Sequence, residues 1–559
     1  MIQSLSLKFG AVPGGAPLTI RPTPITIFVG PNNSGKSTAL AELHRWCVSG
    51  QPAATNVVGA IVFDESTRDE AVEKVGRFTL HPRATDTIPL GYILVGRRGH
   101  RMQAPESSLL SVIEHPNAQP QQFAQWYLQH DTLMLDGPSR IALVKEQDFG
   151  DLQQPPQNSF QVLFREDDRR ERVRTITYEA FGLYFVLDPT KAGKLRIRLA
   201  RRPPASDIEE RGLHQAAADF HGGALGIDEA SDGIKAFTGI ITEVMAGDPA
   251  VLLIDEPEAF LHPALAFKLG QEMSKATRDS NKRLFVATHS PDFVMGCIQS
   301  GAPVNIIRLT YRTGVASARV LPNDDIVRLM RNPLLRSTGV LRALFYESIV
   351  VTEADADRAF YQEINERLVR FSPGCGIPNC LFLNAQNKQT THTLVRPLRS
   401  LGIATAAVVD IDIFKEGGEA WSNFLSGAFV PEIDRQALST TRALVMKEFQ
   451  AVQEADKKNM KRDGGLQLLT GEAHESGKNV VSQLMDYGLF VVEDGELEAW
   501  LRSLGASGHG AVWLVDVFEK MGENPDAPGY VMPGGSDVWA FVGKIKAWLD
   551  NPERRGIPG

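Results

Sequence analysis

Short apolar runs, bounded by glycine, proline and polar residues, alternate with segments of helical periodicity along much of the chain. Residues 25–29 (I-T-I-F-V) predict a buried strand that ends at a glycine, and residues 37–48 predict the helix that follows it. The same patterns predict a helix at 231–246 and further strands at 251–254, 283–288, 348–352 and 405–409. Strands separated by helices are typical of a mostly parallel sheet covered by helices. The sequence therefore predicts an α/β fold.

The pattern changes near residues 335–347, which suggests a boundary between two domains. A chain of 559 residues is long enough for about three to five domains, or for fewer large ones. We expect a first domain at residues 1–345 and a second at 346–559. Residues 51–225 mix strand-like pieces, such as 180–187 and 195–199, with loops, and we interpret them as an insertion in the first domain.

The composition is ordinary for a soluble globular protein, with 43% apolar and 23% charged residues. The net charge of −8 argues against a protein that is basic throughout, although a local basic groove remains compatible with it. The four cysteines form no zinc-binding pattern, and so few thiols fit a reducing cytoplasm. The first residues lack the apolar run of a signal peptide, and no stretch of about 18 apolar residues predicts a membrane span.

Residues 30–37 (G-P-N-N-S-G-K-S) match the phosphate-binding P-loop pattern between a strand and a helix. Glycines let the backbone approach phosphate oxygens, and the amides at the helix N-terminus supply positive potential. We expect Lys36 to reach the β- and γ-phosphates of ATP and Ser37 to bind Mg²⁺. A chance glycine-rich turn is the alternative, which the flanking strand and helix make less favourable. The expected nucleotide-binding residues are Gly30, Asn32, Asn33, Ser34, Gly35, Lys36, Ser37 and Thr38.

Three later motifs follow the P-loop along the chain and are candidates for the same ATP site. Asp255 and Glu256 end a buried strand, where Asp255 is expected in the Mg²⁺ shell and Glu256 is expected to polarise the attacking water. His289 follows the next strand and is a candidate sensor of the γ-phosphate. Ser231 and Gly233 belong to an S-D-G sequence that opens a helix, which is a candidate phosphate-binding site across a dimer interface. Taken singly, these motifs also fit an acidic turn, a structural histidine and a helix cap.

Further carboxylates follow the buried strands of the second domain. Glu353 ends the strand at 348–352, Asp357 follows it, and Asp410 and Asp412 end the strand at 405–409. Carboxylates gathered at one sheet edge repel one another unless cations lie between them, and oxygen ligands suit Mg²⁺ or Mn²⁺. Two such ions support phosphodiester cleavage. The alternative, ordinary polar strand ends, is less favourable for the whole set than for Glu353 alone.

The motif order in the first domain resembles the ATPase heads of the ABC and SMC superfamily. The resemblance rests on the P-loop, S-D-G, D-E-P-E-A-F-L-H-P at 255–263 and T-H-S at 288–290. It implies that two copies of the chain enclose two ATP molecules between them. The glutamine of the family's Q-loop stays unassigned among Gln103, Gln119 and Gln121.

The second domain resembles a TOPRIM domain, in which a strand-end glutamate and a later D-x-D motif hold metal. Ala354 replaces the glycine that usually follows the glutamate. Residues 490–498 resemble the G-[DE]-L-E segment of TOPRIM nucleases, which implies a second metal position at Glu496 and Glu498. The family also uses a late lysine near the scissile phosphate, for which Lys544 is one candidate and Lys520 another.

An ATPase head followed by a TOPRIM domain resembles the overcoming-lysogenization-defect (OLD) family, as do residues 382–389. The resemblance implies an ATP-hydrolysing, metal-dependent DNA endonuclease, often a homo-oligomer and often an anti-phage effector, as in the Gabija system. It also implies a possible partner, either a reverse transcriptase with its retron RNA–DNA or a helicase. The alternative function is an ATP-dependent sensor or scaffold whose weak or inactive TOPRIM domain controls a partner. A transporter ATPase subunit is a third candidate, which the acidic second domain argues against.

For three basic segments we favour a structural role over nucleic-acid binding. Residues 165–174 carry both signs of charge and are expected to form a solvated hairpin. Arg196 and Arg198 share one strand face, and we favour an exposed edge strand over a phosphate contact there. Residues 451–465, rich in lysine, are expected to be an exposed helix or loop. The tryptophans near the C-terminus have apolar neighbours and are expected in the core.

Overall fold

The chain folds into two compact units, Met1–Asp325 and Ile326–Gly559, which are described separately. The computed structural model describes residues 1–558 except Pro13, Ala53, Ala84, 98–99, 247–248, Asp279, Asn281, Thr313, 322–323, Asp325, 328–330 and 332–338. The division precedes the boundary that we expected after residue 345, and part of that expected boundary region lies outside the described residues.

A six-stranded sheet forms the centre of the first unit, in the order β15-β14-β3-β13-β12-β7. All neighbours are parallel except β14 and β15. The strands are β3 (Ile25–Val29), β7 (Thr132–Leu135), β12 (Val251–Asp255), β13 (Arg283–Ala287), β14 (Val304–Arg312) and β15 (Val315–Leu321). Every residue of β3 is buried, as its continuous apolar sequence predicted.

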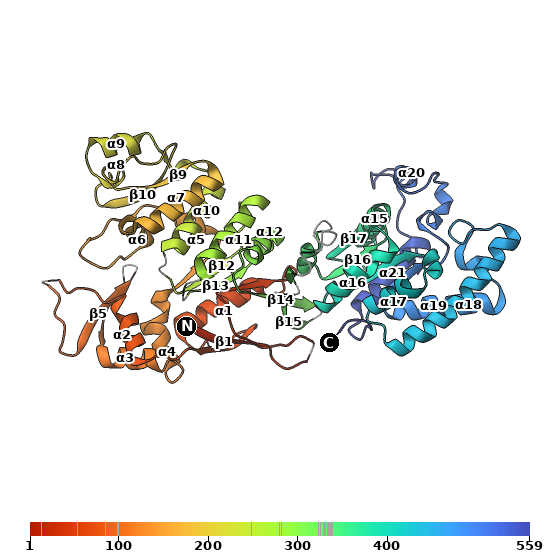
Figure 1. Ribbon diagram of the computed structural model, residues 1–559, viewed down its shortest axis with the longest axis horizontal. Helices are drawn as coiled ribbons and strands as arrows, with labels where there is room; N and C mark the ends of the chain where they lie inside the picture. Colours follow the sequence, from red (N-terminus) through yellow and green to blue (C-terminus); the bar gives the residue numbers. More distant parts are fainter. Residues whose placement is uncertain are drawn as a thin grey trace. The chain divides into compact units, whose positions relative to one another are not determined.

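Helices and a smaller sheet cover the central sheet (Figure 1). The smaller sheet, β2-β1-β4, is antiparallel and shares a core with α1 and one face of the central sheet. Helices α10, α11 and α12 lie along the other face. The elements are β1 (Ile2–Leu7), β2 (Thr19–Ile20), β4 (Val58–Phe63), α1 (Lys36–Ser49), α10 (Asp232–Ala246), α11 (Pro263–Arg278) and α12 (Pro291–Gln299).

The segment 51–225, expected as an insertion, contributes strands to the central sheet and to the smaller sheet that covers it. Its strand β4 pairs with β1, and its strand β7 extends the central sheet beside β12. The rest forms a hairpin, a second antiparallel sheet around β10, and short helices. These elements are α2 (Arg68–Gly76), β5 (Tyr92–Arg97), β6 (His100–Pro105), α3 (Glu106–Glu114), α4 (Pro120–Trp126), α5 (Gly137–Ala142), β8 (Gln147–Asp148), α6 (Ser159–Arg165), α7 (Asp167–Phe181), β9 (Tyr184–Asp188), β10 (Lys194–Ala200), α8 (Asp207–Arg211), α9 (Gln215–Gly222) and β11 (Leu225–Gly226).

Two expectations for the basic segments are wrong. Residues 167–181 form helix α7 rather than a hairpin, because Arg170 and Arg174 are buried against the buried Glu210. Strand β10 is not an edge strand, since it pairs with β8, β9 and β11. Its Arg196 and Arg198 both bind Asp188 Oδ2, at 2.6 Å each, and therefore hold the fold together.

Asp188→Asn is expected to destabilise the protein by about 3–5 kcal/mol, because it leaves two arginines facing a neutral amide in a buried site. Burial raises the pKa of Asp188, but hydrogen bonds from Thr190 and Arg198 outweigh burial and hold the pKa at about 2, below the usual 3.8. The stabilisation is therefore present above the usual pKa and is lost as pH falls toward 2.

Urea unfolding of Asp188→Asn, compared with Asp148→Asn, measures this effect. Asp148 is exposed and pairs with Lys194, so its substitution should cost at most about 1 kcal/mol. An equal decrease in the free energy of unfolding in the two variants would show that the buried Asp188 contributes no more stability than the exposed Asp148.

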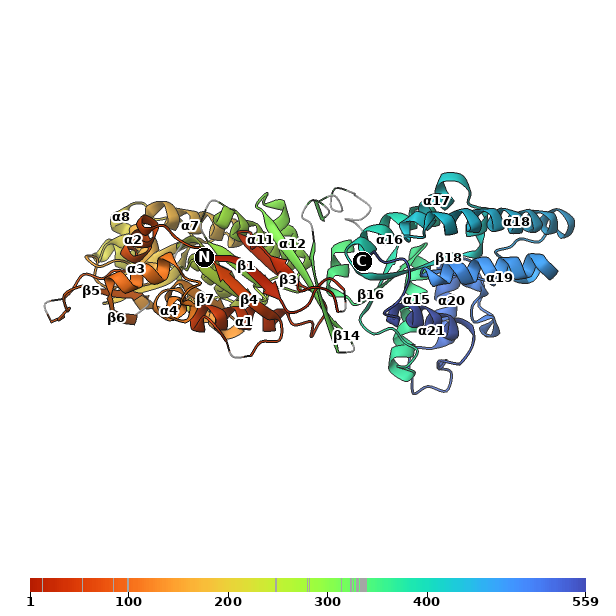
Figure 2. The same cartoon turned by 90° about the horizontal axis from the view of Figure 1, so that it is seen from below.

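The second unit contains a four-stranded sheet in the order β17-β16-β18-β19, with every pair parallel. Helices α15, α20 and α21 share a core with one face, and α16 and α17 lie on the other side (Figure 2). The strands are β16 (Ser348–Thr352), β17 (Cys380–Asn384), β18 (Ala404–Asp410) and β19 (Leu489–Val492). The helices are α15 (Asp355–Phe371), α16 (Thr391–Ser400), α17 (Gly418–Gly427), α18 (Glu432–Asp456), α19 (Gly471–Asp486), α20 (Ala511–Met521) and α21 (Asp537–Asp550). The prediction that the late tryptophans are core residues is confirmed for Trp500, Trp513, Trp539 and Trp548.

Candidate ATP site and candidate metal centre

The P-loop, the acidic motif and His289 lie at one edge of the central sheet of the first unit. Strand β13 pairs with β3 on one side and with β12 on the other, and all three strands are parallel. Their carboxyl ends therefore meet, with His289 after β13, between the P-loop and the Asp255–Glu256 pair. The strands predicted from apolar runs thus bring together motifs that are far apart in the sequence.

The P-loop backbone has the shape of a cradle that only glycine permits at its start. Gly30 has φ 144°, and a Cβ on it would lie 2.1 Å from the carbonyl oxygen of Leu309. The Oγ of Ser34 is buried and has no hydrogen-bond partner among the described residues, so it is available to a ligand. Asn32, Asn33, Ser37 and Thr38 are exposed around the cradle. These features fit a nucleotide phosphate.

Lys36 and Ser37 begin helix α1 and point toward the same site. Lys36 Nζ donates to the carbonyl oxygens of Gly30 and Pro31, at 2.9 and 2.8 Å. Burial lowers the pKa of Lys36 to about 8, against the opposing influence of the nearby Asp255. Ser37 Oγ donates to Asp255 Oδ1 at 3.1 Å, so the two predicted Mg²⁺ ligands are neighbours.

Glu256 and His289 are also neighbours, as their predicted roles require. His289 Nε2 lies 3.8 Å from Glu256 Oε1, and the Glu256 side chain is half exposed. Burial, followed by the charge of Lys36, lowers the pKa of His289 and favours the neutral imidazole. Glu256 itself has φ 51°, an uncommon conformation for a residue other than glycine.

Two residues of this site were not anticipated. Arg140, at the C-terminal end of the short helix α5, donates to the backbone carbonyl oxygens of Asp255 and Glu256 and fixes the turn that presents them. Glu258 accepts a hydrogen bond from His289 N at 2.8 Å, and burial raises its pKa. Glu258 belongs to the quoted D-E-P-E motif, whereas no sequence signal marks Arg140.

Ser231 and Gly233 lie at the start of α10, and Ser231 is exposed. A Cβ on Gly233 would lie 2.6 Å from the carbonyl oxygen of Phe260, which explains a glycine at this position. No hydrogen bond among the described residues joins Ser231 to the P-loop. Their role across a dimer interface stays a prediction.

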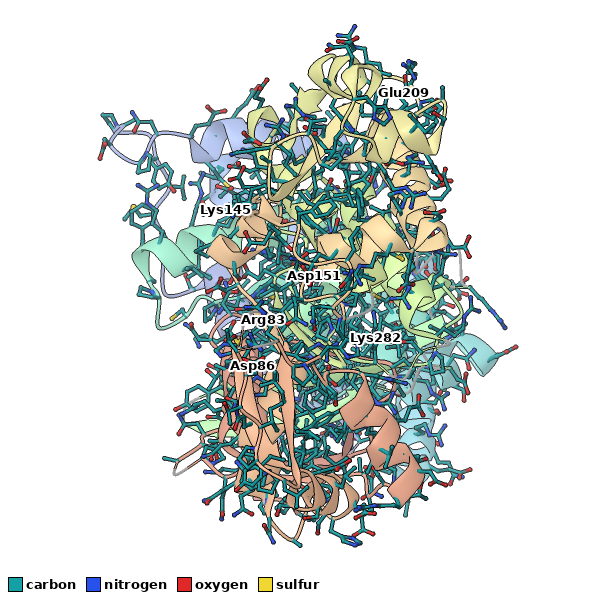
Figure 3. All side chains as sticks on the ribbon, turned by 90° about the vertical axis from the view of Figure 1, so that its left-hand side faces the viewer. Arg83, Asp86, Lys145, Asp151, Glu209 and Lys282 are labelled. Atoms are coloured by element: carbon teal, nitrogen blue, oxygen red, sulfur yellow. The ribbon has the colours of Figure 1, made fainter. Side chains whose placement is uncertain are left out.

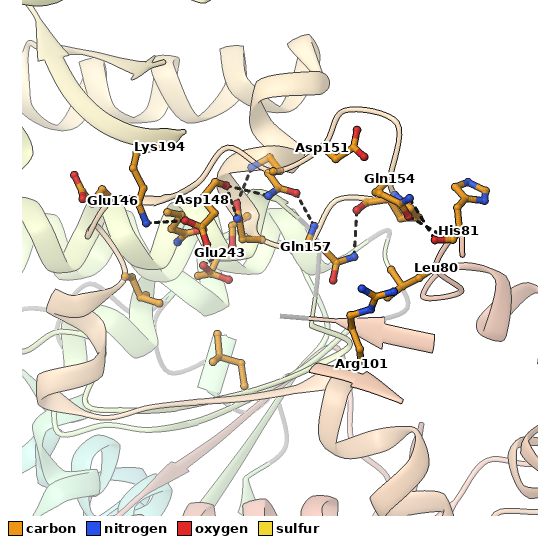
Figure 4. Close-up of a pocket in the computed structure, with 18 of the residues that line it drawn as sticks. Leu80, His81, Arg101, Glu146, Asp148, Asp151, Gln154, Gln157, Lys194 and Glu243 are labelled. Atoms are coloured by element: carbon orange, nitrogen blue, oxygen red, sulfur yellow. Dashed lines mark hydrogen bonds and ion pairs between the residues drawn. The ribbon is translucent and has the colours of Figure 1, made fainter. Parts of the chain in front are cut away.

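A separate cavity of about 690 Å³ in the first unit contains no P-loop residue. It is lined by both signs of charge, including Arg101, Lys194, Asp148 and Glu243, and Lys194 pairs with Asp148 there (Figure 4). Arg83 and Asp151, which also line the cavity, appear on the face of the unit shown in Figure 3. This mixture of charges selects no single class of ligand.

In the second unit, parallel strands bring the predicted carboxylates to one sheet edge. Strand β18 pairs with both β16 and β19, so Glu353, Asp410 and Glu496 follow adjacent strands. One carboxylate oxygen each from Glu353, Asp410 and Asp412 lies within 4.8 Å of the others, and we call these three the first acidic cluster. Glu496 and Glu498 form a second cluster of the same size with His509.

The electrostatics of the first acidic cluster favour a bound cation. Burial, with the neighbouring Asp410 charge, raises the pKa of Glu353 to about 8. Burial also raises the pKa of Asp410 to about 7. Asp412 is buried, and its Oδ1 has no hydrogen-bond partner among the described residues. Buried carboxylate oxygens that lack a partner fit Mg²⁺ or Mn²⁺.

The second cluster contains a residue that the sequence did not indicate. His509 Nδ1 lies 2.7 Å from Glu498 Oε1, which also accepts a hydrogen bond from Gly510 N at 2.6 Å. Asp357, a predicted metal ligand, instead accepts a hydrogen bond from Ala354 N at 2.8 Å, and burial raises its pKa to about 6. Its part in metal binding stays a prediction.

The lysines at the metal centre differ from the expected ones. Lys461, from the lysine-rich segment expected to be exposed, lies 2.9 Å from Asp410 Oδ2, and Lys388 lies 2.5 Å from Asp412 Oδ2. Burial disfavours the charged form of Lys461, but Asp410 and its neighbours outweigh burial and raise its pKa. Lys544 lies on the exposed side of α21, and Lys520 pairs with Asp516. Within the described chain, neither Lys544 nor Lys520 forms an ion pair with the clustered carboxylates.

Comparison with known proteins supports the ATPase assignment of the first unit. A family model described as "AAA domain, putative AbiEii toxin, Type IV TA system" matches residues 153–295. The match begins inside the segment expected as an insertion and contains the S-D-G, D-E-P-E and T-H-S motifs. Together with the P-loop geometry, it supports a P-loop ATPase domain.

Solved structures of SMC head domains are similar to part of the chain. A head domain bound to the C-terminal winged-helix domain of ScpA is 17% identical, covers 58% of this chain and 99% of its own, and gives a TM-score of 0.34. The SMC head domain from Thermotoga maritima is 14% identical, the match covers 57% of this chain and 99% of the head domain, and the TM-score is 0.30. A head domain derived from Pyrococcus furiosus is 14% identical, the match covers 59% of this chain and 98% of the head domain, and the TM-score is 0.31. TM-scores of this size do not establish a shared fold.

No curated protein matches the chain. None of the helices in the described part of the chain is both long enough and apolar enough to span a membrane.

Proposed function

We propose that this chain is an ATP-controlled, metal-dependent DNA endonuclease. The observation that carries the proposal is the first acidic cluster, in which Asp412 Oδ1 is buried and has no hydrogen-bond partner in the described part of the chain. The second cluster supplies further ligands at the same sheet edge. Two divalent cations at such a site would activate water and stabilise the leaving oxygen of a phosphodiester.

The residues of the chain would divide this work among them. Glu353, Asp410 and Asp412 would hold one cation, and Glu496 and Glu498, with His509, would hold the other. The lysine that the TOPRIM resemblance places near the scissile phosphate is better supplied by Lys461 than by Lys544, because Lys461 alone of the two contacts these carboxylates.

The ATPase unit would act as the control element. Lys36 and the cradle at Gly30 would hold the phosphates, Ser37 and Asp255 the Mg²⁺ ion, and Glu256 would orient the attacking water. Ser231 and Gly233 of one copy would complete the ATP site of a second copy in a homodimer or larger homo-oligomer. An anti-phage role in the cytoplasm, with a reverse transcriptase or helicase as partner, rests on the resemblance to the OLD family alone.

The test incubates the purified chain, without partners, with supercoiled plasmid DNA and Mg²⁺ or Mn²⁺. We expect nicked or linear products that a chelator abolishes. If no metal yields products, the alternative of an ATP-dependent sensor or scaffold replaces the nuclease.

A further inference from the structure

Lys461 places one positive charge between the two acidic clusters of the second unit. Its Nζ lies 2.9 Å from Asp410 Oδ2 and 3.1 Å from Glu496 Oε2. A third oxygen, Asp412 Oδ2, lies 4.0 Å away. The ammonium therefore contacts ligand atoms of both proposed metal positions at once.

The backbone around Lys461 is built to hold this side chain in place. A Cβ on Gly495, which has φ 135°, would lie 2.0 Å from the carbonyl oxygen of Lys461. A Cβ on Gly465 would lie 1.9 Å from the carbonyl oxygen of Glu493, and Leu466 N donates to that same oxygen at 2.9 Å. The loop after α18 thus packs directly on the turn after β19, which carries Glu496.

The negative charge of the two acidic clusters is partly offset by Lys461 in the metal-free chain and would be offset by divalent cations in the metal-bound chain. In the metal-free chain the ammonium offsets the repulsion between neighbouring carboxylates. A divalent cation bound by Asp410 or Glu496 would lie within a few ångströms of Nζ, where like charges repel strongly in a half-buried site. The ammonium and the metal ions therefore compete for the same oxygens.

We propose that Lys461 is the exchangeable cation of this centre, holding the two clusters together until divalent metal displaces it. The inference rests on the proposed metal centre and goes beyond it by naming the group that sets its metal affinity. Lys388 does not share this role, because its ion pairs among the described residues are with Asp412 and Glu416, and none reaches the second cluster.

The test measures Mn²⁺ affinity by isothermal titration calorimetry, without DNA or ATP, for the full chain and for Lys461→Met. We expect Lys461→Met to bind Mn²⁺ at least about tenfold more tightly, because a competing charge is gone. We also expect its metal-free form to melt at a lower temperature and to gain more from added Mn²⁺ than the wild type gains. Lys544→Met, which removes an exposed lysine, should match the wild type in both measurements.

Unchanged or weaker Mn²⁺ binding by Lys461→Met would overturn the exchange. If Lys461→Met does not fold, Lys461→Gln and the charge-preserving Lys461→Arg take its place, and only the glutamine variant should bind Mn²⁺ more tightly. Because the measurement uses no DNA, its outcome is separate from that of the nuclease assay. Exchange without cleavage would reject the nuclease alone, whereas no Mn²⁺ binding in any variant would reject the metal centre.

Discussion

Glu256→Gln is expected to lower ATP turnover by about 10²–10⁴-fold while ATP affinity stays within a few-fold of the wild type. Glu256 directly follows the apolar strand β12, with its carboxylate 3.8 Å from His289 Nε2 and open to solvent. The amide keeps the size of the side chain but cannot accept a proton from water. In the proposed site, nucleotide binding would depend instead on the cradle at Gly30 and on Lys36.

Two further variants serve as controls for Glu256→Gln, one expected to lose nucleotide binding and one expected to behave as the wild type. Lys36→Ala should abolish nucleotide binding, because the ammonium that faces the phosphates is lost. Glu179→Gln removes an exposed carboxylate that pairs with Lys268 and should behave as the wild type. Phosphate release and equilibrium ATP binding are measured for all three. Turnover that persists in both Glu256→Gln and Lys36→Ala would refute the roles assigned to them.

Asp410→Ala is expected to reduce metal-dependent DNA cleavage to background, a loss of at least about 10³-fold. Asp410 is the carboxylate nearest Lys461, and its backbone N donates to Glu353 Oε1 at 2.9 Å, so it links the strand β18 to the first acidic cluster. Removing its carboxylate deletes a proposed metal ligand and leaves Lys461 with fewer counter-charges.

Glu416→Gln is the matched control for Asp410→Ala. Glu416 lies 3.8 Å from Lys388 but belongs to neither acidic cluster, so the variant should cut plasmid DNA at a rate near that of the wild type. Thermal unfolding verifies that both variants are folded. If the wild type and Asp410→Ala cut DNA at equal rates, the first acidic cluster is not the nuclease site.

The sequence predicted the strands that matter most for both sites. The runs at β3, β12, β16 and β18 are short and largely apolar; β3 leads into the glycine that opens the P-loop, and the other three lead into carboxylates. The pattern therefore located both the strands and the functional residues at their ends. Parallel pairing then brings those ends together, which is why Asp255 reaches Ser37 and Glu353 reaches Asp410.

Residues delivered by distant loops could not be predicted in the same way. Lys461 reaches Asp410 only after the chain has passed through α17 and α18, and its position depends on the close approach of Gly495. Arg140 lies in a segment whose fold the pattern did not resolve. Arg196 and Arg198 were read as surface charges because their partner, Asp188, comes from the neighbouring strand β9.

We propose that the ATP site of this chain controls its metal centre. The most direct test measures plasmid cleavage by the wild type and by Lys36→Ala, with metal present and with ATP either added or omitted. We expect ATP to change the cleavage rate of the wild type, in one direction or the other, and to leave the rate of Lys36→Ala unaffected. Equal rates with and without ATP in the wild type, or the same response in Lys36→Ala, would contradict it.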